Sequence, residues 1–176
     1  MRFTETKVAG AWLIEPEPIA DERGFFARTF CREEFADHGL NPELAQANVS
    51  FNHRKGTLRG MHYQQAPHQE AKLVRCTQGA IFDVVVDLRP GWPTHRAWFG
   101  AELTAGNRAM LYVPEDCAHG FLTLTDGAEV AYQMSAPYVA GAGRGVRWDD
   151  PAFGIEWPGE VVVINERDRT YPDVGP

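Results

Sequence analysis

An arginine, a histidine and an amide stand within six residues of one another in the segment 56–64, Gly-Thr-Leu-Arg-Gly-Met-His-Tyr-Gln. Histidine titrates near neutral pH and suits acid–base chemistry, whereas arginine binds anionic groups. The β-leaning residues of this segment predict a short strand. Strict alternation along a strand would send Arg59 and His62 to opposite faces, unless Gly60 marks a bulge that brings both into one pocket.

Two of the six histidines, His62 and His119, each follow a strand-like run and a sharp turn signal. A histidine that transfers protons needs a partner to fix its tautomer, and this partner is usually a carboxylate. Asp83, Asp87 and Asp168 are the candidates for that partner. A structural or surface role remains the alternative for either histidine.

Tyr132 is a candidate proton donor, because a phenol in a dry pocket can hold or release a proton once its pKa is tuned. Its alternative role is that of a strand aromatic that packs on the core. Arg23, Arg59, Lys72 and Arg75 form a candidate cation cluster for a small anionic ligand, although Arg59 and Lys72 also fit solvated surface positions.

A metal site is a second possibility, since His62, His68, Glu70 and His119 are ligand types that a barrel could bring together. The pattern is incomplete, because position 64 holds glutamine where a His-x-His pair would place its second histidine. The sequence therefore favours a pocket without metal.

The 176 residues fit one domain, residues 1–176, with 44% apolar and 23% charged residues, as in a water-soluble globular protein. A net charge of −7 argues against nucleic acid or an anionic membrane as partner. No apolar run approaches the roughly 20 residues that span a bilayer, and the N-terminus resembles no secretion signal, so we expect a cytoplasmic protein. Three cysteines without a CxxC spacing argue against disulfides and a zinc knuckle.

Short β-rich runs separated by Gly, Pro, Asn and Asp turn signals dominate the chain, and this spacing predicts an all-β sandwich or barrel. The run 80–88 is the clearest strand, with one face for the core and Asp83 and Asp87 on the other. A helix is expected over 32–38, ended by Gly39, with a short turn at 42–45. From about residue 137 we expect irregular cover with one late strand. The expected strands are 8–14, 25–30, 47–51, 73–77, 80–88, 97–103, 110–113, 120–124, 129–134 and 161–164.

Several motifs taken together resemble those of the dTDP-4-dehydrorhamnose 3,5-epimerase family of nucleotide-sugar enzymes, and the resemblance covers nearly the whole chain. They are the segments 23–26, 46–50, 56–64, 72–75, 83–89, 113–121, 148–158 and 166–168. The resemblance implies a cupin-type β jelly roll, a homodimer, a nucleotide-sugar substrate, and no metal or organic cofactor.

The resemblance also implies roles for single residues. His62 matches the catalytic base, Asp168 the carboxylate that hydrogen-bonds it, and Tyr132 the opposing acid. Lys72 and Arg59 match groups near the 4-keto oxygen and the diphosphate of the substrate. The remaining positions match the nucleotide side or the pocket wall: Arg23, Phe26, Gln46, Asn48, His119 and Tyr138.

The resemblance also implies a geometry for segment 56–64. Gly60 is expected to depart from regular pleating, so that His62 and Arg59 reach the same pocket. Two positions depart from the family pattern, since Arg28 replaces a common acidic residue and Asn165 a common serine. Epimerisation at C3, at C5 or at both carbons stays open. A metal-dependent cupin enzyme using His62, Glu70 and His119, and a non-catalytic nucleotide-sugar binding protein, are the competing hypotheses.

Overall fold

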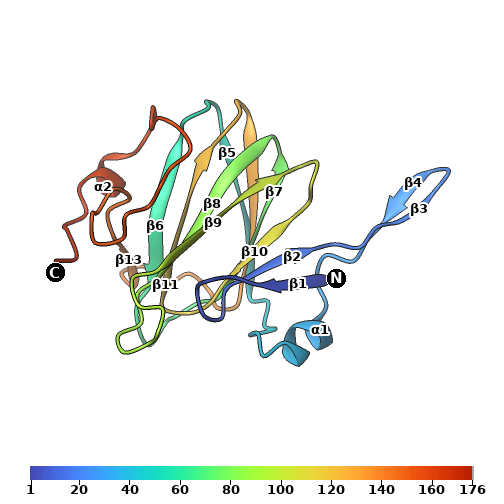
Figure 1. Cartoon of the computed structure of the whole chain (residues 1–176), viewed down its shortest axis with the longest axis horizontal. Helices are drawn as coiled ribbons and strands as arrows, with labels where there is room; N and C mark the ends of the chain where they lie inside the picture. Colours follow the sequence, from blue (N-terminus) through green and yellow to red (C-terminus); the bar gives the residue numbers. More distant parts are fainter. Residues whose placement is uncertain (176) are drawn as a thin grey trace.

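Two antiparallel β-sheets face each other in the computed structural model, which describes residues 1–175 (Figure 1). This architecture confirms the predicted all-β, cupin-type jelly roll. One sheet has the order β1 (Arg2–Glu5), β2 (Trp12–Glu15), β10 (Met110–Val113), β7 (Lys72–Gln78), β12 (Ala128–Met134), β5 (Gln46–Asn52). The other has the order β13 (Gly143–Gly145), β6 (Leu58–Gln64), β11 (Cys117–Thr123), β8 (Ala80–Asp87), β9 (Trp98–Thr104).

The main core lies between the two sheets, where alternate residues of each strand point inward. Val74 and Val130 of the first sheet pack in one cluster with Val85 and Phe121 of the second, and all four are at most 1% exposed. Burial of such apolar side chains is the main force that holds two sheets face to face. Polar groups placed on the same inward faces are therefore removed from water as well.

A short helix, α1 (Arg32–Asp37), covers part of the outer face of the six-stranded sheet. Its Phe35 is 1% exposed and packs with Ile14 and Met110. The helix ends as the sequence predicts, because Gly39 follows it with a φ of +70°, a left-handed conformation that favours glycine. The expected turn at 42–45 is irregular chain.

The chain beyond residue 137 folds back as cover, as predicted, and it packs on the outer face of the five-stranded sheet. Val146 and Phe153 of this segment pack against Val84 and Val86 of β8. Both faces of β8 are therefore core, which corrects the expectation that its carboxylate face lies outside the core. Asp83 on the inner face is fully buried.

The strand boundaries differ from prediction mainly at the two ends of the chain. The first expected strand, 8–14, begins only at Trp12, after Gly10 with a φ of +78°, and β1 precedes it. The late strand is the short β13, whereas 161–164 is irregular chain in which Val163 forms an isolated bridge with Thr57. A second short helix, α2 (Glu166–Arg169), was not expected.

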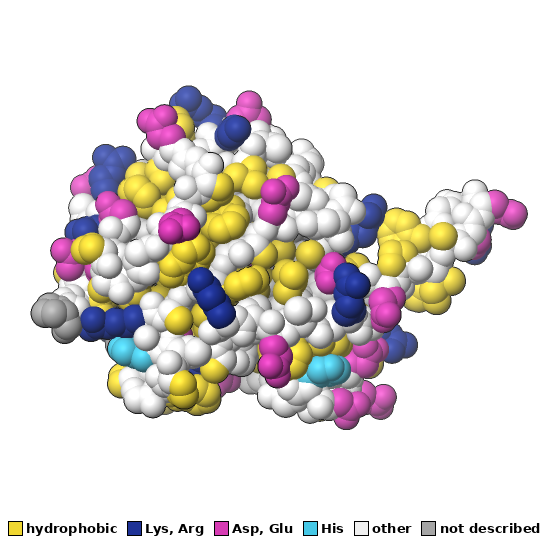
Figure 2. Space-filling view, viewed as in Figure 1, with side chains coloured by type: hydrophobic (Ala, Val, Ile, Leu, Met, Phe, Trp, Pro, Cys, Tyr) yellow, Lys and Arg dark blue, Asp and Glu magenta, His cyan; other side chains and the backbone are white. Residues whose placement is uncertain are grey.

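A two-stranded hairpin, β3 (Ile19–Asp21) with β4 (Gly24–Phe26), projects from the body of the molecule (Figure 1). Figure 2 shows apolar side chains on this projecting arm. Ile19 and Phe26 are each 72% exposed. Within residues 1–175, the helices are all too short or too polar to cross a membrane.

Candidate active site

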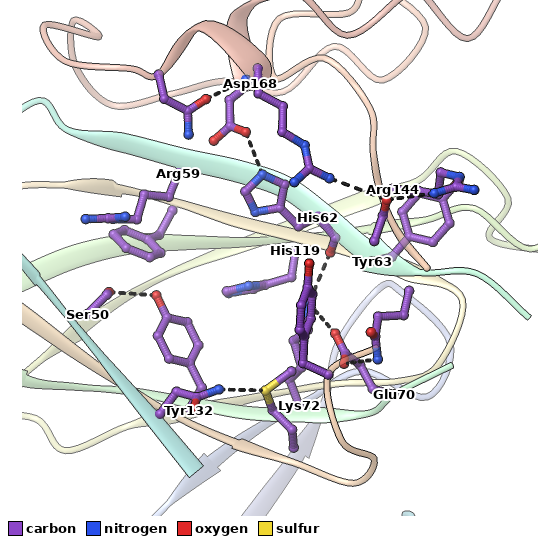
Figure 3. A pocket seen from close by; sticks show the side chains of 18 residues that line it. Ser50, Arg59, His62, Tyr63, Glu70, Lys72, His119, Tyr132, Arg144 and Asp168 are labelled. Atoms are coloured by element: carbon purple, nitrogen blue, oxygen red, sulfur yellow. Dashed lines mark hydrogen bonds and ion pairs between the residues drawn. The ribbon is translucent and has the colours of Figure 1, made fainter. Parts of the chain in front are cut away.

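One cavity of about 320 Å³ opens between the two sheets, within the size range of small-molecule sites (Figure 3). Both sheets and the C-terminal segment contribute to its wall. The lining residues are Asn48, Ser50, Arg59, His62, Tyr63, Gln64, Glu70, Lys72, His119, Phe121, Tyr132, Met134, Tyr138, Gly143, Arg144, Asn165, Arg167 and Asp168.

Strand β6 departs from regular pleating at Gly60, which has a φ of +141°. The pairing of β6 with β11 shifts register between His119 and Phe121, at the point where Gly60 crosses β11. As a result, Arg59 and His62 both line the cavity. The geometric prediction for this segment is confirmed.

His62 is hydrogen-bonded to Asp168, with 2.6 Å between Nε2 and Oδ1 (Figure 3). An ionised carboxylate only accepts, so Nε2 carries the proton and Nδ1 keeps a free lone pair. The Asp168 side chain is fully buried, whereas that of His62 is 39% exposed. The pair therefore has the form of a base accessible from the cavity and held by a buried carboxylate.

Asp168 reaches His62 because α2 places it there. The Asn165 side chain caps this helix by accepting a hydrogen bond of 2.7 Å from the Asp168 N–H. The second Asp168 oxygen, Oδ2, accepts from the Gly60 N–H at 3.1 Å. The asparagine that departs from the family pattern thus performs the capping that serine also performs well.

We expect Asn165→Ala to destabilise the fold by about 0.5–2 kcal/mol, the usual cost of losing a side-chain N-cap. Chemical denaturation monitored by fluorescence measures this change. Asn165→Ser is the matched variant and should retain most of the stability, because serine caps helices about as well as asparagine. Equal losses in both variants would remove the cap as the reason for asparagine at this position.

His119 has its own carboxylate partner, with 2.8 Å between its Nε2 and Oδ1 of Asp83. It is the cross-strand neighbour of His62, since β11 pairs with β6 at these two positions. Both candidate histidines therefore meet one of the predicted aspartates. The third, Asp87, is instead engaged by Arg89 at 2.8 Å, away from the cavity lining.

Tyr132 enters the cavity from β12 in the six-stranded sheet, whereas His62 enters from β6 in the five-stranded sheet (Figure 3). Its hydroxyl lies 2.8 Å from Oγ of Ser50. Burial raises the pKa of Tyr132 to about 12, so the phenol is protonated at neutral pH. The cavity thus has a candidate base on one side and a candidate acid on the other.

Lys72 stands at the start of β7 with its side chain 9% exposed. Its Nζ donates to the carbonyl of His62 at 3.1 Å and lies 3.2 Å from Oε1 of Glu70. Burial lowers the pKa of Lys72, and the neighbouring Glu70 opposes this effect. A charged ammonium here would face substrate with little competing water.

The cations of the site differ from the expected cluster. Arg59 and Lys72 line the cavity, but Arg75 is exposed elsewhere on β7 and Arg23 lies on the projecting hairpin. Two exposed arginines of the C-terminal segment take their places at the wall, Arg144 and Arg167. Sequence reasoning missed both, because the elements that carry them, β13 and α2, are too short to give a periodic signal.

Among the predicted nucleotide-side residues, Asn48 and Tyr138 line the cavity and Gln46 stands beside them. The Gln46 amide nitrogen donates to Oδ1 of Asn48 at 3.2 Å, and its oxygen accepts from the Tyr138 N–H at 3.0 Å. The three residues form one polar network, with Tyr138 56% exposed.

Arg23 and Phe26 are not brought to the cavity of their own chain. Both belong to the hairpin that projects from the body (Figure 1). Arg28, just after this hairpin, also lies outside the cavity lining and donates to Glu34 at 2.6 Å. Its departure from the family pattern therefore produces a surface ion pair within one chain.

The proposed metal ligands His62, Glu70 and His119 each have a different partner: Asp168, Lys72 and Asp83 respectively. Within residues 1–175, no group of three or more His, Cys, Asp or Glu side chains gathers as a metal site would require. The three cysteines are free thiols, of which Cys76 and Cys117 are buried.

Comparison with known proteins gives consistent matches over the whole chain. The family model described as dTDP-4-dehydrorhamnose 3,5-epimerase matches residues 5–175. The Sinorhizobium fredii protein of that name is 43% identical over 175 residues, which cover 99% of this chain and 90% of that protein. The Elizabethkingia anophelis enzyme structure superposes with a TM-score of 0.96 at 34% identity, covering 99% and 96% of the chains. A Bacillus anthracis enzyme structure with TDP and PPi bound gives 0.93 at 38% identity, covering 98% and 99%.

Proposed function

Because the chain belongs to the dTDP-4-dehydrorhamnose 3,5-epimerase family and is thereby an isomerase, we propose that it inverts carbons next to the ketone of a nucleoside-diphospho-4-keto-6-deoxy sugar. The proposed reaction converts dTDP-4-dehydro-6-deoxyglucose to dTDP-4-dehydrorhamnose. The observation that carries the proposal is the cavity in which His62, held by Asp168, and Tyr132 stand on opposite sheets.

The first step in this proposal is proton abstraction. Nδ1 of His62 takes the proton from the carbon beside the ketone, and the electron pair of that C–H bond moves to the 4-keto oxygen. The Lys72 ammonium stabilises the resulting enolate, and Asp168 stabilises the imidazolium. These roles match the position of each group in the cavity wall.

Reprotonation completes the inversion. The phenol of Tyr132 gives its proton to the same carbon from the opposite face, so one C–H bond is broken and another is formed. Nothing is oxidised or reduced overall, and the reaction needs no redox partner. His62 then releases its extra proton to solvent, and the Tyr132 phenolate takes up one proton from solvent, so both groups return to their starting states.

The rest of the cavity fits the nucleotide part of such a substrate. Positive charge for a diphosphate comes from Arg59, Arg144 and Arg167. A guanidinium group can donate two parallel hydrogen bonds to two oxygens of one phosphate. Asn48 and Tyr138 offer polar and stacking contacts to the nucleoside at the edge of the cavity. We assign His119 to the inner wall, where Asp83 holds it.

Incubation of the protein with nucleotide 4-keto sugars in D₂O tests the proposal. We expect deuterium to enter C3, C5 or both, and NMR of the recovered sugar identifies the carbon. Varying the nucleoside identifies the base that is recognised. Intact protein that exchanges no hydrogen in any of these sugars would exclude the proposed reaction and favour a binding protein.

We propose further that the protein acts as a homodimer in which the hairpin of one chain reaches the cavity of its partner. The hairpin exposes Ile19 and Phe26, and two isolated strands are only marginally stable in water. Strand β5 is an edge strand with Val49 62% exposed, and it carries the cavity residues Asn48 and Ser50. An unpaired edge favours strand addition by another chain.

Phe26→Asp should weaken dimer formation by about 30-fold or more, because loss of a central interface aromatic costs about 2 kcal/mol. Sedimentation velocity over a dilution series measures this change. Trp92→Asp is the control, since Trp92 is also an exposed aromatic, 50% exposed, but lies in the loop between β8 and β9 and not on the hairpin. A wild-type protein that sediments as a monomer at all concentrations would exclude the dimer.

Three free cysteines agree with a reducing compartment, and we therefore propose a cytoplasmic location.

A further inference from the structure

The ammonium of Lys72 depends on a buried partner that has no role in the reaction described above. A lysine with a side chain 9% exposed loses most of its hydration, and the charged form is costly unless another group compensates. The carbonyl of His62 accepts one hydrogen bond from Nζ, but a carbonyl carries no full charge. A carboxylate in contact would compensate much better.

Glu70 supplies that carboxylate. Its side chain is 4% exposed, and Oε1 lies 3.2 Å from Nζ of Lys72. Its second oxygen, Oε2, accepts a hydrogen bond of 2.7 Å from Nε2 of Gln64 (Figure 3). Both oxygens of Glu70 are therefore engaged, one by the cation and one by an amide.

Gln64 is itself fixed on all sides. It is 2% exposed, and its Nε2 also donates to the carbonyls of His68 at 3.0 Å and Pro137 at 3.2 Å. Its oxygen accepts from the N–H of Val139 at 2.8 Å. The two N–H groups of this amide are shared among three acceptors, and its oxygen is engaged as well. These contacts favour one orientation of the amide and thereby hold Glu70.

We propose that Glu70, clamped by Gln64, is the positioning residue that keeps Lys72 charged and aimed into the cavity. The inference rests on the role of Lys72 in the proposed function. Gln64 and His62 lie on the same strand, β6. This one strand would therefore position the proton-transfer residue His62 and, through Gln64 and Glu70, the ammonium of Lys72.

The surroundings of Lys72 determine in which direction its pKa is shifted. Burial lowers its pKa, while Glu70 and, more weakly, Asp83 from β8 raise it. The same cavity is lined by further charged or titratable side chains, which are those of Arg59, His62, Tyr63, His119, Tyr132, Tyr138, Arg144, Arg167 and Asp168. Lys72 loses its proton as pH rises through its pKa, so removal of the Glu70 charge moves this loss to lower pH.

Glu70→Gln tests the proposal, with the exchange rate measured from mildly acidic to alkaline pH. We expect a near-normal rate at the acidic end and a deficit that grows to about 10²-fold as pH rises, the usual cost of losing one oxyanion-stabilising group. KM should change little. NMR titration of the Lys72 side chain should show a lower midpoint in the variant than in wild type.

Two further variants separate charge from structure. Asp87→Asn removes another fully buried carboxylate, one that pairs with Arg89 outside the cavity, and should leave the pH profile unchanged. Glu70→Asp keeps the charge but draws it back by one methylene, so the Lys72 midpoint should fall between those of wild type and Glu70→Gln. Glu70→Asp also provides the test of the Lys72 midpoint if Glu70→Gln does not fold.

An unchanged Lys72 midpoint in the Glu70 variants, or a Glu70→Gln rate that stays parallel to wild type at every pH, would overturn the proposal. If wild type exchanges nothing, the proposed function fails instead. The NMR titration would still decide the coupling between Glu70 and Lys72, because it needs no substrate.

Discussion

Replacement of His62 by alanine is expected to reduce solvent exchange into the sugar by about 10²–10⁴-fold, the usual cost of losing a positioned general base. Nδ1 of His62 is the atom that would take the proton, and Asp168 holds its ring from the other side at 2.6 Å. Deuterium incorporation followed by NMR under single-turnover conditions measures the loss directly, independently of product release.

The control for this experiment is His95→Ala. His95 is an exposed histidine of the loop between β8 and β9, away from the cavity lining. Its replacement should leave the exchange rate unchanged. If His62→Ala also kept a near-normal rate, His62 would not be the base, and His119 with Asp83 would become the first alternative pair.

A second large effect is expected for Tyr132→Phe, but on a different observable. Without the phenol, His62 can still remove the proton and return one from solvent on the same face. Exchange should therefore continue while inversion falls by about 10²–10⁴-fold, the contribution of a positioned acid. Comparison of deuterium content with the stereochemistry of the recovered sugar separates the two rates.

Tyr112→Phe is the matched control, because burial also raises the pKa of Tyr112 to about 12 and this residue lies outside the cavity lining. It should exchange and invert at the wild-type rates. Parallel loss of exchange and inversion in Tyr132→Phe would argue that Tyr132 shapes the cavity and does not act as the opposing acid.

Sequence could predict those parts of the site in which the type of a residue limits which partners or backbone conformations it can have. A proton-transferring histidine at position 62 needs a carboxylate partner, and Asp168 is one of three candidates from residue type alone; the family resemblance selects it. Gly60 in a strand called for a bulge, which explains how Arg59 and His62 share a cavity.

The remaining features depend on tertiary contacts with weak local signals. The four residues of α2 are too few for a periodic pattern, and the helix is stabilised by its Asn165 cap and the buried Asp168. Arg144 and Arg167 reach the cavity because the C-terminal segment folds across the sheet. By residue type Glu70 is a possible metal ligand, whereas in the structure it contacts Lys72. Arg23 lies on the projecting hairpin and outside the cavity lining, so its predicted role rests on the proposed dimer.

The crossing of β6 and β11 has a consequence for how this site can change by mutation. A Cβ atom on Gly60 would lie 2.5 Å from Cα of Gly120, and a Cβ on Gly120 would lie 2.9 Å from Cα of Gly60. Each position excludes any side chain at the other, and glycine offers nothing smaller for a compensating substitution. Libraries that aim to alter substrate choice should therefore keep both glycines fixed and vary the cavity wall from other strands.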